Sequence, residues 1–196
     1  MFIKKAEFEI TVAESSKILK TANNEFAFVG RSNAGKSSLI NALTNNKNLA
    51  KTSSTPGLTK HINYFRMNNG EFYLVDLPGY GYHKAGKKDE ERWTSLLEDY
   101  FKDSPNLKLV FILMDIRVGA NELDRQMLKY LVYYNIPFMI VLTKADKISK
   151  AQRKNCAFKI ATDLGLTLNE TIITSSDQKF GLDEILNTFD RFITKD

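Results

Sequence analysis

The sequence predicts a three-layer α/β fold, in which a mixed, mostly parallel sheet of about six or seven strands carries helices on both faces. Two observations lead to this prediction. Short apolar runs, typical of buried strands, alternate along the chain with segments whose apolar residues recur at helical spacing. One such run, Phe26–Val29, leads directly through a glycine-rich turn into a helical segment. In sheets of this kind, ligands bind at the carboxyl ends of the strands.

The elements of the first half follow from pattern. Residues 6–12 alternate apolar and polar side chains, as a half-exposed strand at a sheet edge does. Residues 13–22 are expected to form a short helix, and Phe26–Val29 the first central strand. A helix continues through Leu43, and the polar stretch Thr44–Lys60, which has no hydrophobic period, is expected to be a loop.

The middle of the chain is predicted to begin with a hairpin. Ile62–Met67 and Glu71–Asp76 are short strand-like runs, and Asn68-Asn69-Gly70 between them is a typical tight turn. The glycines and proline of residues 78–86 then interrupt regular structure. A helix follows whose apolar face consists of Trp93, Leu96, Leu97, Tyr100 and Phe101.

The second half continues the alternation of strands and helices. Continuous apolar runs predict strands buried on both faces, and apolar residues at helical spacing predict the helices between them. The predicted strands are Leu109–Met114, Phe138–Leu142 and Thr171–Thr174, and the predicted helices are Asn121–Tyr134, a Lys/Arg-bearing helix ending near Ala161, and a final helix after Gly181.

Composition excludes several classes of protein. At 196 residues the chain is expected to form one domain over residues 1–196, with residues 1–22 as an N-terminal strand and helix extension. No apolar run approaches the roughly 20 residues needed to cross a bilayer, and the N-terminus lacks a signal-peptide core. The single cysteine, Cys156, cannot form an internal disulfide, which favours a cytoplasmic protein.

The turn after the first central strand carries a phosphate-binding motif. Gly30 and Gly35-Lys36-Ser37 fill the fixed positions of Gly-x-x-x-x-Gly-Lys-Ser between a strand and a helix. Glycines let backbone amides approach the phosphates of a nucleotide, and the helix N-terminus adds to the anion site. Lys36 is expected to reach the β- and γ-phosphates, and the Ser37 hydroxyl to bind Mg²⁺. The predicted loop contacts are Gly30, Arg31, Ser32, Asn33, Ala34, Gly35, Lys36 and Ser37.

Three later motifs fall at strand ends. Asp76-Leu77-Pro78-Gly79 is expected to hold Mg²⁺ through water at Asp76 and to face the γ-phosphate with the Gly79 amide. Thr143-Lys144-Ala145-Asp146 is expected to read guanine, because the Asp146 carboxylate can accept from the ring N–H and the exocyclic amine, which adenine does not offer along that edge. Thr174-Ser175-Ser176 is placed to present backbone amides to the guanine carbonyl.

The ordered motifs resemble those of translation-factor-type GTPases within the P-loop NTPases. More narrowly, Gly-Arg-Ser-Asn-Ala-Gly-Lys-Ser, Pro-Gly-Leu-Thr and Asp-Leu-Pro-Gly-Tyr-Gly-Tyr resemble the bacterial EngB family, also called YihA or YsxC. The resemblance covers essentially the whole chain. It implies a Ras-like G domain, GTP and GDP as ligands, Mg²⁺ as cofactor, and a first switch in which Thr59, rather than Thr55, binds Mg²⁺. The first-switch contacts are Gly57, Leu58, Thr59, Lys60 and His61.

The expected chemistry is slow GTP hydrolysis that a partner stimulates. Tyr80 follows Gly79 where Ras-like enzymes place the glutamine that orients the attacking water, and Thr143 stands where many relatives have asparagine. In similar GTPases an asparagine at the position of Asn33 helps to hold K⁺ against the phosphates, although Asn33 can equally be a turn residue. The catalytic candidates are Lys36, Thr59, Gly79 and Asn33.

Net charge and resemblance together point to a partner. A formal charge of +5 makes nucleic acid a candidate, although lysines can also simply solvate a surface. The resemblance implies a monomer that assists assembly of the large (50S) ribosomal subunit, with effects on septation. Two alternatives stay open: a cell-division GTPase that acts through proteins without RNA, and a nucleotide-binding module with negligible turnover. The lysine-rich clusters expected to contact RNA are Lys84, Lys87 and Lys88, and Lys147, Lys150, Arg153 and Lys154.

Overall fold

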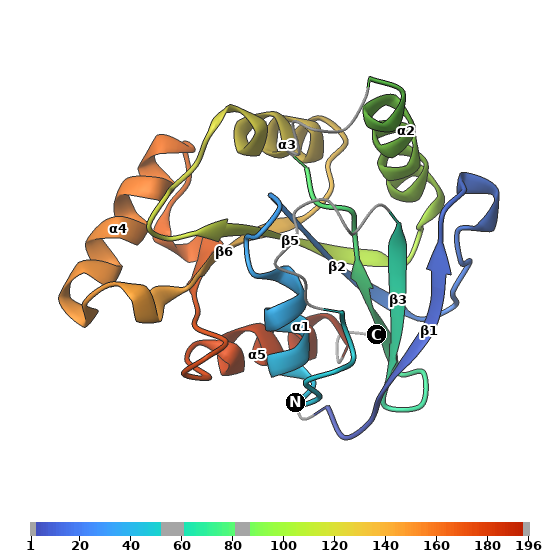
Figure 1. The fold of residues 1–196 in the computed structure, drawn as a ribbon, viewed down its shortest axis with the longest axis horizontal. Helices are drawn as coiled ribbons and strands as arrows, with labels where there is room; N and C mark the ends of the chain where they lie inside the picture. Colours follow the sequence, from blue (N-terminus) through green and yellow to red (C-terminus); the bar gives the residue numbers. More distant parts are fainter. Residues whose placement is uncertain (1–2, 52–60, 81–86, 194–196) are drawn as a thin grey trace.

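The computed structural model describes residues 3–51, 61–80 and 87–193, and within them a seven-stranded sheet lies at the centre of the molecule (Figure 1). The strand order across the sheet is β1-β3-β4-β2-β5-β6-β7. Because β2 lies in the middle, the glycine-rich turn that follows it emerges at the centre of one edge. The strands are β1 (Ala6–Val12), β2 (Asn24–Gly30), β3 (Ile62–Met67), β4 (Phe72–Asp76), β5 (Leu107–Asp115), β6 (Phe138–Thr143) and β7 (Thr171–Ile173).

The sheet is mixed and mostly parallel, as predicted. Strands β4, β2, β5, β6 and β7 pair in parallel, whereas β3 is antiparallel to both of its neighbours. The β3–β4 hairpin turns through Asn68, Asn69 and Gly70, all with positive φ, and the Gly70 amide donates to the Met67 oxygen. Asparagine and glycine adopt this left-handed backbone most readily, so the predicted Asn-Gly turn is confirmed.

Helices cover both faces of the sheet, which confirms the three-layer prediction (Figure 1). One buried cluster packs the sheet against α2, α3 and α4, and a second packs it against α1 and α5. The second cluster is rich in phenylalanine, and Phe189 of α5 contacts the rings of Phe26, Phe72 and Phe111. The helices are α1 (Lys36–Leu43), α2 (Lys87–Asp103), α3 (Glu122–Tyr133), α4 (Lys150–Asp163) and α5 (Leu182–Ile193).

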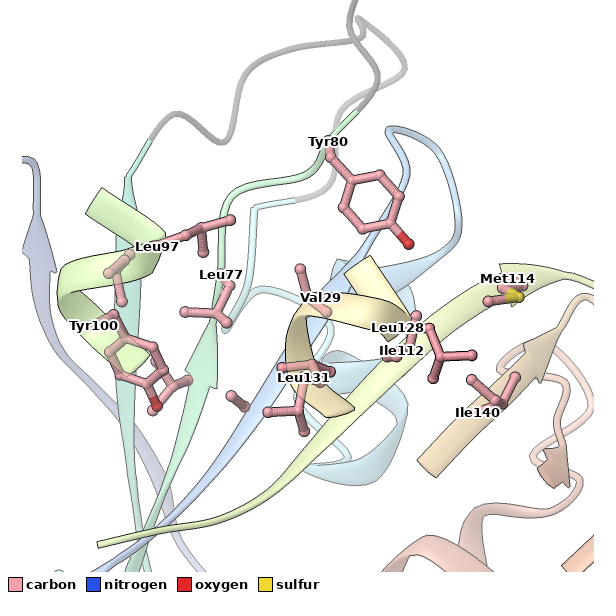
Figure 2. Packing of buried hydrophobic residues seen from close by; sticks show 14 of the residues in the cluster. Val29, Leu77, Tyr80, Leu97, Tyr100, Ile112, Met114, Leu128, Leu131 and Ile140 are labelled. Carbon is pink, nitrogen blue, oxygen red and sulfur yellow. The ribbon is translucent and has the colours of Figure 1, made fainter. Parts of the chain in front are cut away.

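The cluster beneath α2 and α3 extends to the edge of the sheet at which the glycine-rich turn after β2 emerges (Figure 2). Leu97 and Tyr100 come from α2, Leu128 and Leu131 from α3, and the β-strands fill the space between them. Tyr80 lies at one end of this cluster and is only 4% exposed. The residue directly after Gly79 is therefore part of the hydrophobic core.

The helix predicted over residues 13–22 is wrong. The structure has only a three-residue 3₁₀-helix in this stretch, Ser15–Lys17, and residues 18–22 have no regular structure. The Ser15 hydroxyl donates to the Asp99 carboxylate of α2, and Ile18 is buried in the cluster under α2. A short helix is marginal by itself, so these tertiary contacts determine the local path.

The predicted loop after α1 is described as far as residue 51 and has no regular structure there. The Asn41 side chain fixes its course, because it donates to the Ala50 oxygen and accepts from the Ala50 amide. Among the described residues, no helix has the length and apolar character that a membrane crossing requires.

Candidate nucleotide site

Among the described residues, the predicted motifs at the strand ends meet at one edge of the sheet. The parallel strands end there, and each is followed by a polar or glycine-rich turn, as ligand sites in such sheets require. His61 reaches the same edge from the other direction, since β3 runs antiparallel to β4, and it is exposed. The strand ends at this edge are Gly30 of β2, Asp76 of β4, Asp115 of β5, Thr143 of β6 and Ile173 of β7.

The phosphate-binding loop has the backbone shape that the motif predicts. Gly35, which directly precedes α1, has a φ of 92°. Residues with a side chain rarely adopt this left-handed backbone conformation. Asn33 also has positive φ, 65°, and its side chain is exposed. The first amides of a helix have no acceptor within the helix, so the N-terminus of α1 at Lys36 can bind an anion.

Lys36 and Asp76 form a buried ion pair. The Lys36 ammonium donates to the Asp76 carboxylate, and the two residues are only 8% and 2% exposed. Asn63 of β3 lies 3.5 Å from the other carboxylate oxygen. A cation suited to phosphate and a carboxylate suited to Mg²⁺ thus lie side by side, and Ser37 follows Lys36 in the first turn of α1. These groups fit a magnesium-bound nucleotide, because Mg²⁺ prefers a few protein oxygens together with phosphate oxygens.

Thr143 connects the base-reading loop to the phosphate-binding loop. Its buried hydroxyl donates to the Ala34 oxygen at 2.6 Å. Lys144 adds a second connection, because its ammonium donates to the Asn33 oxygen at 2.7 Å. The Thr143 hydroxyl and the Lys144 ammonium thus join the two loops directly.

Asp115, which no sequence motif indicated, holds Lys144 in place. Its carboxylate lies 3.2 Å from the Lys144 ammonium and accepts from the Arg117 guanidinium at 2.7 Å. Burial alone would raise the pKa of Asp115, but the hydrogen bonds from Arg117 and Lys144 outweigh it and lower the pKa to about 2. The only sequence signal was its position as the last residue of a buried strand at the ligand edge.

The Asp146 carboxylate is oriented by two neighbours. It accepts from the Lys147 ammonium at 2.9 Å and from the Ser175 hydroxyl at 2.7 Å, and these hydrogen bonds lower its pKa. Ser175 is itself fixed, since its hydroxyl also accepts from the Gln178 amide and its backbone pairs with Phe180. An ionised, oriented carboxylate can accept two parallel N–H donors from a guanine edge.

The predicted use of backbone amides at Thr174-Ser175-Ser176 needs correction. The Thr174 amide donates to Leu142 and the Ser175 amide to Phe180, both within the protein. Secondary-structure pairing therefore occupies two of the three amides that were expected to face guanine. Among the described residues of this motif, Ser176 remains the candidate amide donor, and Ser175 contributes its hydroxyl to Asp146 instead.

Several predicted contact residues point their side chains into the protein. Leu77, Ala34 and Ala145 are buried, so only their backbone groups can face a nucleotide. The Arg31 guanidinium also turns away from the loop: it donates to the Gly119 oxygen and lies 3.2 Å from the Asp124 carboxylate of α3. The first-switch candidates Gly57, Leu58, Thr59 and Lys60 fall outside the described residues.

Tyr80 meets the same carboxylate. Its hydroxyl donates to Asp124 at 2.7 Å and points toward α3 (Figure 2). Burial, and then the adjacent Asp124 charge, raise the pKa of Tyr80 well above its ordinary value, so it remains a neutral donor. The position that orients water in Ras-like enzymes is thus occupied by a side chain directed into the protein. Asp124 is a second residue that sequence reasoning missed, since it belongs to none of the motifs.

Sequence comparisons agree with this geometry. Residues 25–144 match a family model described as a 50S ribosome-binding GTPase. A protein of Clostridium kluyveri named "Probable GTP-binding protein EngB" is 47% identical over 98% of both chains. A protein of the same name from Desulfosudis oleivorans is 44% identical over 97% of this chain and 96% of its own.

Solved structures show the same fold at low sequence identity. A probable GTP-binding protein engB superposes with a TM-score of 0.71 at 23% identity, over 88% of this chain and all of that one. Aquifex aeolicus Era bound to GDP and AlF₄⁻ gives 0.70 at 22% identity, over 89% of this chain and 57% of Era. A structure of Era with MgGDPNP and nucleotides of 16S ribosomal RNA gives 0.68 at 21% identity, over 88% of this chain and 57% of Era.

Proposed function

The chain belongs to the EngB family of GTP-binding proteins and has a GTPase domain, and from that premise we propose that it is a nucleotide switch in the assembly of the 50S ribosomal subunit. With GTP and Mg²⁺ bound, the protein would adopt the form that binds a pre-ribosomal particle, and hydrolysis of the GTP would release the particle. The observation that carries the proposal is the junction of the two loops: Thr143 and Lys144 of the base-reading loop bind the phosphate-binding loop directly.

In this proposal, the phosphates and Mg²⁺ replace the Lys36–Asp76 ion pair: they become the partners of Lys36 and of Asp76, respectively. With a nucleotide bound, Lys36 would contact the β- and γ-phosphates, and Asp76, through water, would help to hold Mg²⁺. Ser37 and Thr59 would supply hydroxyl ligands to the metal. The buried ion pair supports this arrangement, because it places the ammonium and the carboxylate side by side with both charges compensated. Asp146 reads guanine while Lys144 lies along the base.

Hydrolysis is proposed to be slow without a partner. The Tyr80 hydroxyl is bound to Asp124, so this side chain does not orient the attacking water. Lys36, Thr59 and the Gly79 amide would then stabilise the negative charge of the transition state. A K⁺ ion that Asn33 would help to hold would add a further positive charge. A bound particle would supply the missing group or fix the switch segments.

Four observations support a ribosomal partner. The matching family model is described as ribosome-binding, and the structurally similar Era was solved with ribosomal RNA. The chain has a net charge of +5. Lys150 and Lys154 are exposed on α4, whereas Arg153 of the same predicted cluster is buried and donates to the Ala145 oxygen. We propose that the protein acts as a monomer in the cytoplasm, with effects on septation.

The test is GTP turnover with and without ribosomal particles. Purified protein is assayed alone, with 50S particles and with 30S particles, at a fixed salt concentration. The proposal predicts slow turnover that 50S particles raise and 30S particles do not. Unchanged turnover with either particle would favour the cell-division alternative with protein partners, and no turnover under any condition would favour a nucleotide-binding module.

A further inference from the structure

Asp124 is a fully buried carboxylate on which three parts of the chain converge. It is 0% exposed. One carboxylate oxygen accepts from the Tyr80 hydroxyl at 2.7 Å, and the other lies 3.2 Å from Arg31 Nε and 2.8 Å from the Asn121 amide that it accepts from. Burying a charge is costly unless it is fully hydrogen-bonded, so this carboxylate holds its three neighbours firmly.

Two of those neighbours flank the proposed γ-phosphate position. Arg31 lies in the phosphate-binding loop, and Tyr80 directly follows Gly79. Their backbones also pair: the Tyr80 amide donates to the Gly30 oxygen and the Ser32 amide donates to the Tyr80 oxygen, each at 3.2 Å. Asp124 therefore fixes the side chains of two segments whose backbones are already joined.

Gly79 lies close to the backbone of the phosphate-binding loop in this junction. A Cβ atom at Gly79 would lie 3.2 Å from the Gly30 oxygen and 3.5 Å from the Ser32 nitrogen. The close approach leaves little freedom for the Gly79 peptide while Tyr80 stays in place. Whatever holds the Tyr80 ring thus also sets the direction of the neighbouring Gly79 amide.

We propose that Asp124 is a positioning residue for γ-phosphate recognition, which acts by anchoring Tyr80 and through it the Gly79 amide. The proposal rests on the proposed function, in which that amide contacts the γ-phosphate. GDP lacks this phosphate, so Asp124 contributes to GTP binding and little to GDP binding. Asp124 thus helps the protein to distinguish GTP from GDP without contacting either nucleotide.

A purely structural role for Asp124 predicts something different. Asp124 also completes a capping box with Asn121 at the start of α3. If capping were its whole role, removing its partners would lower stability and would weaken GDP and GTP binding alike. The ratio of the two affinities therefore distinguishes positioning from capping.

The main variant is Tyr80→Phe, which removes one hydroxyl and leaves the Asp124–Arg31 pair and the ring packing in place. Affinities for GDP and for a non-hydrolysable GTP analogue are measured with Mg²⁺ by calorimetry, and the unfolding temperature is measured beside them. We expect about a tenfold loss for the GTP analogue, in line with loss of a charge-assisted hydrogen bond, and less than about a twofold change for GDP.

Asp124→Asn is the second variant, because it keeps the size of the side chain and removes its charge. It should shift the affinity ratio in the same direction. Arg125→Met is the matched control: it lies next to Asp124 on α3 and removes a surface ion pair with Asp163. The control should leave both affinities unchanged.

The positioning role would be overturned if the ratio of the two affinities stayed the same in Tyr80→Phe and Asp124→Asn. This holds whether both affinities are unchanged or both fall by the same factor. These results are distinct from a failure of the proposed function. Wild-type protein that bound neither guanine nucleotide would contradict the function itself, before any variant was compared.

Discussion

The Thr143 hydroxyl lies 2.6 Å from the Ala34 oxygen and donates a hydrogen bond to it, which joins the end of β6 to the phosphate-binding loop. Both residues are buried. The part of the site proposed to read the base and the part proposed to hold the phosphates are therefore not independent, because this contact and the hydrogen bond from Lys144 to the Asn33 oxygen join them.

Thr143→Val should weaken GDP and GTP binding to the same extent. Valine keeps the shape of the side chain but leaves the buried Ala34 oxygen without this donor, at a cost of about 1–2 kcal/mol, or about five- to thirtyfold in affinity. Calorimetric titration measures it. Thr188→Val is the control, because its hydroxyl donates to the Glu184 oxygen within α5, away from the site. Equal losses in the two variants would contradict the prediction.

Asp146→Asn should change the preferred base from guanine to xanthine. Xanthine carries a carbonyl where guanine has its exocyclic amine, so an amide can donate to it where a carboxylate would repel it. The Ser175 hydroxyl that orients Asp146 can still donate to the asparagine oxygen. Competition of GDP and xanthosine diphosphate for the site measures the change. Retained preference for GDP in the variant would show that Asp146 does not read the base.

Glu25 should make the protein less stable as the pH rises. Burial raises the pKa of Glu25 above 4.5, and the hydrogen bonds from Thr21 and Tyr100 offset this only in part. Because the folded pKa lies above the unfolded one, this group favours folding most at low pH, and its contribution falls as the pH rises from about the unfolded pKa toward the folded one.

Glu25→Gln removes that titration. The free energy of unfolding in urea is measured for wild type and variant between about pH 4 and pH 8, a range that begins near the usual pKa of glutamate. As the pH increases, the variant should gain stability relative to wild type. The exposed Glu184→Gln serves as the control. Parallel stability curves for wild type and Glu25→Gln would contradict the assignment.

Hydrolysis should be faster in K⁺ than in Na⁺ if Asn33 helps to hold a cation against the phosphates. The positive φ of Asn33 also suits a plain turn residue, so rate rather than geometry decides between the two. Turnover is compared in KCl and NaCl at equal ionic strength, with Asn33→Gly as the variant that keeps the turn. Equal wild-type rates in the two salts would remove K⁺ from the mechanism.

Sequence patterns predicted the elements whose cause is local. The hairpin at Asn68-Asn69-Gly70 and the phosphate-binding turn at Gly35 depend on backbone conformations that few residues adopt, so the residue types alone identify them. Buried strands such as β5 were visible as apolar runs. The helix expected over residues 13–22 was wrong because Ile18 packs into a core assembled from distant segments.

The parts of the site that sequence did not reveal depend on contacts between distant residues. Asp115 and Asp124 belong to no motif, and each matters only because folding brings Lys144 or Tyr80 to it. The Ser175 amide, which was expected to face guanine, instead donates to the Phe180 oxygen, and no local pattern indicates this pairing. Arg153 likewise reads as a surface charge in sequence but lies over the Phe180 ring.

The most direct test of the proposed switch is co-sedimentation with ribosomal particles. Protein loaded with GDP or with a non-hydrolysable GTP analogue is centrifuged with 50S and 30S particles over a series of salt concentrations. The proposal predicts binding to 50S particles in the GTP-like state, lost as salt rises and weak with GDP. Failure to bind either particle in either nucleotide state would contradict the ribosomal role, while leaving the protein's place among GTPases intact.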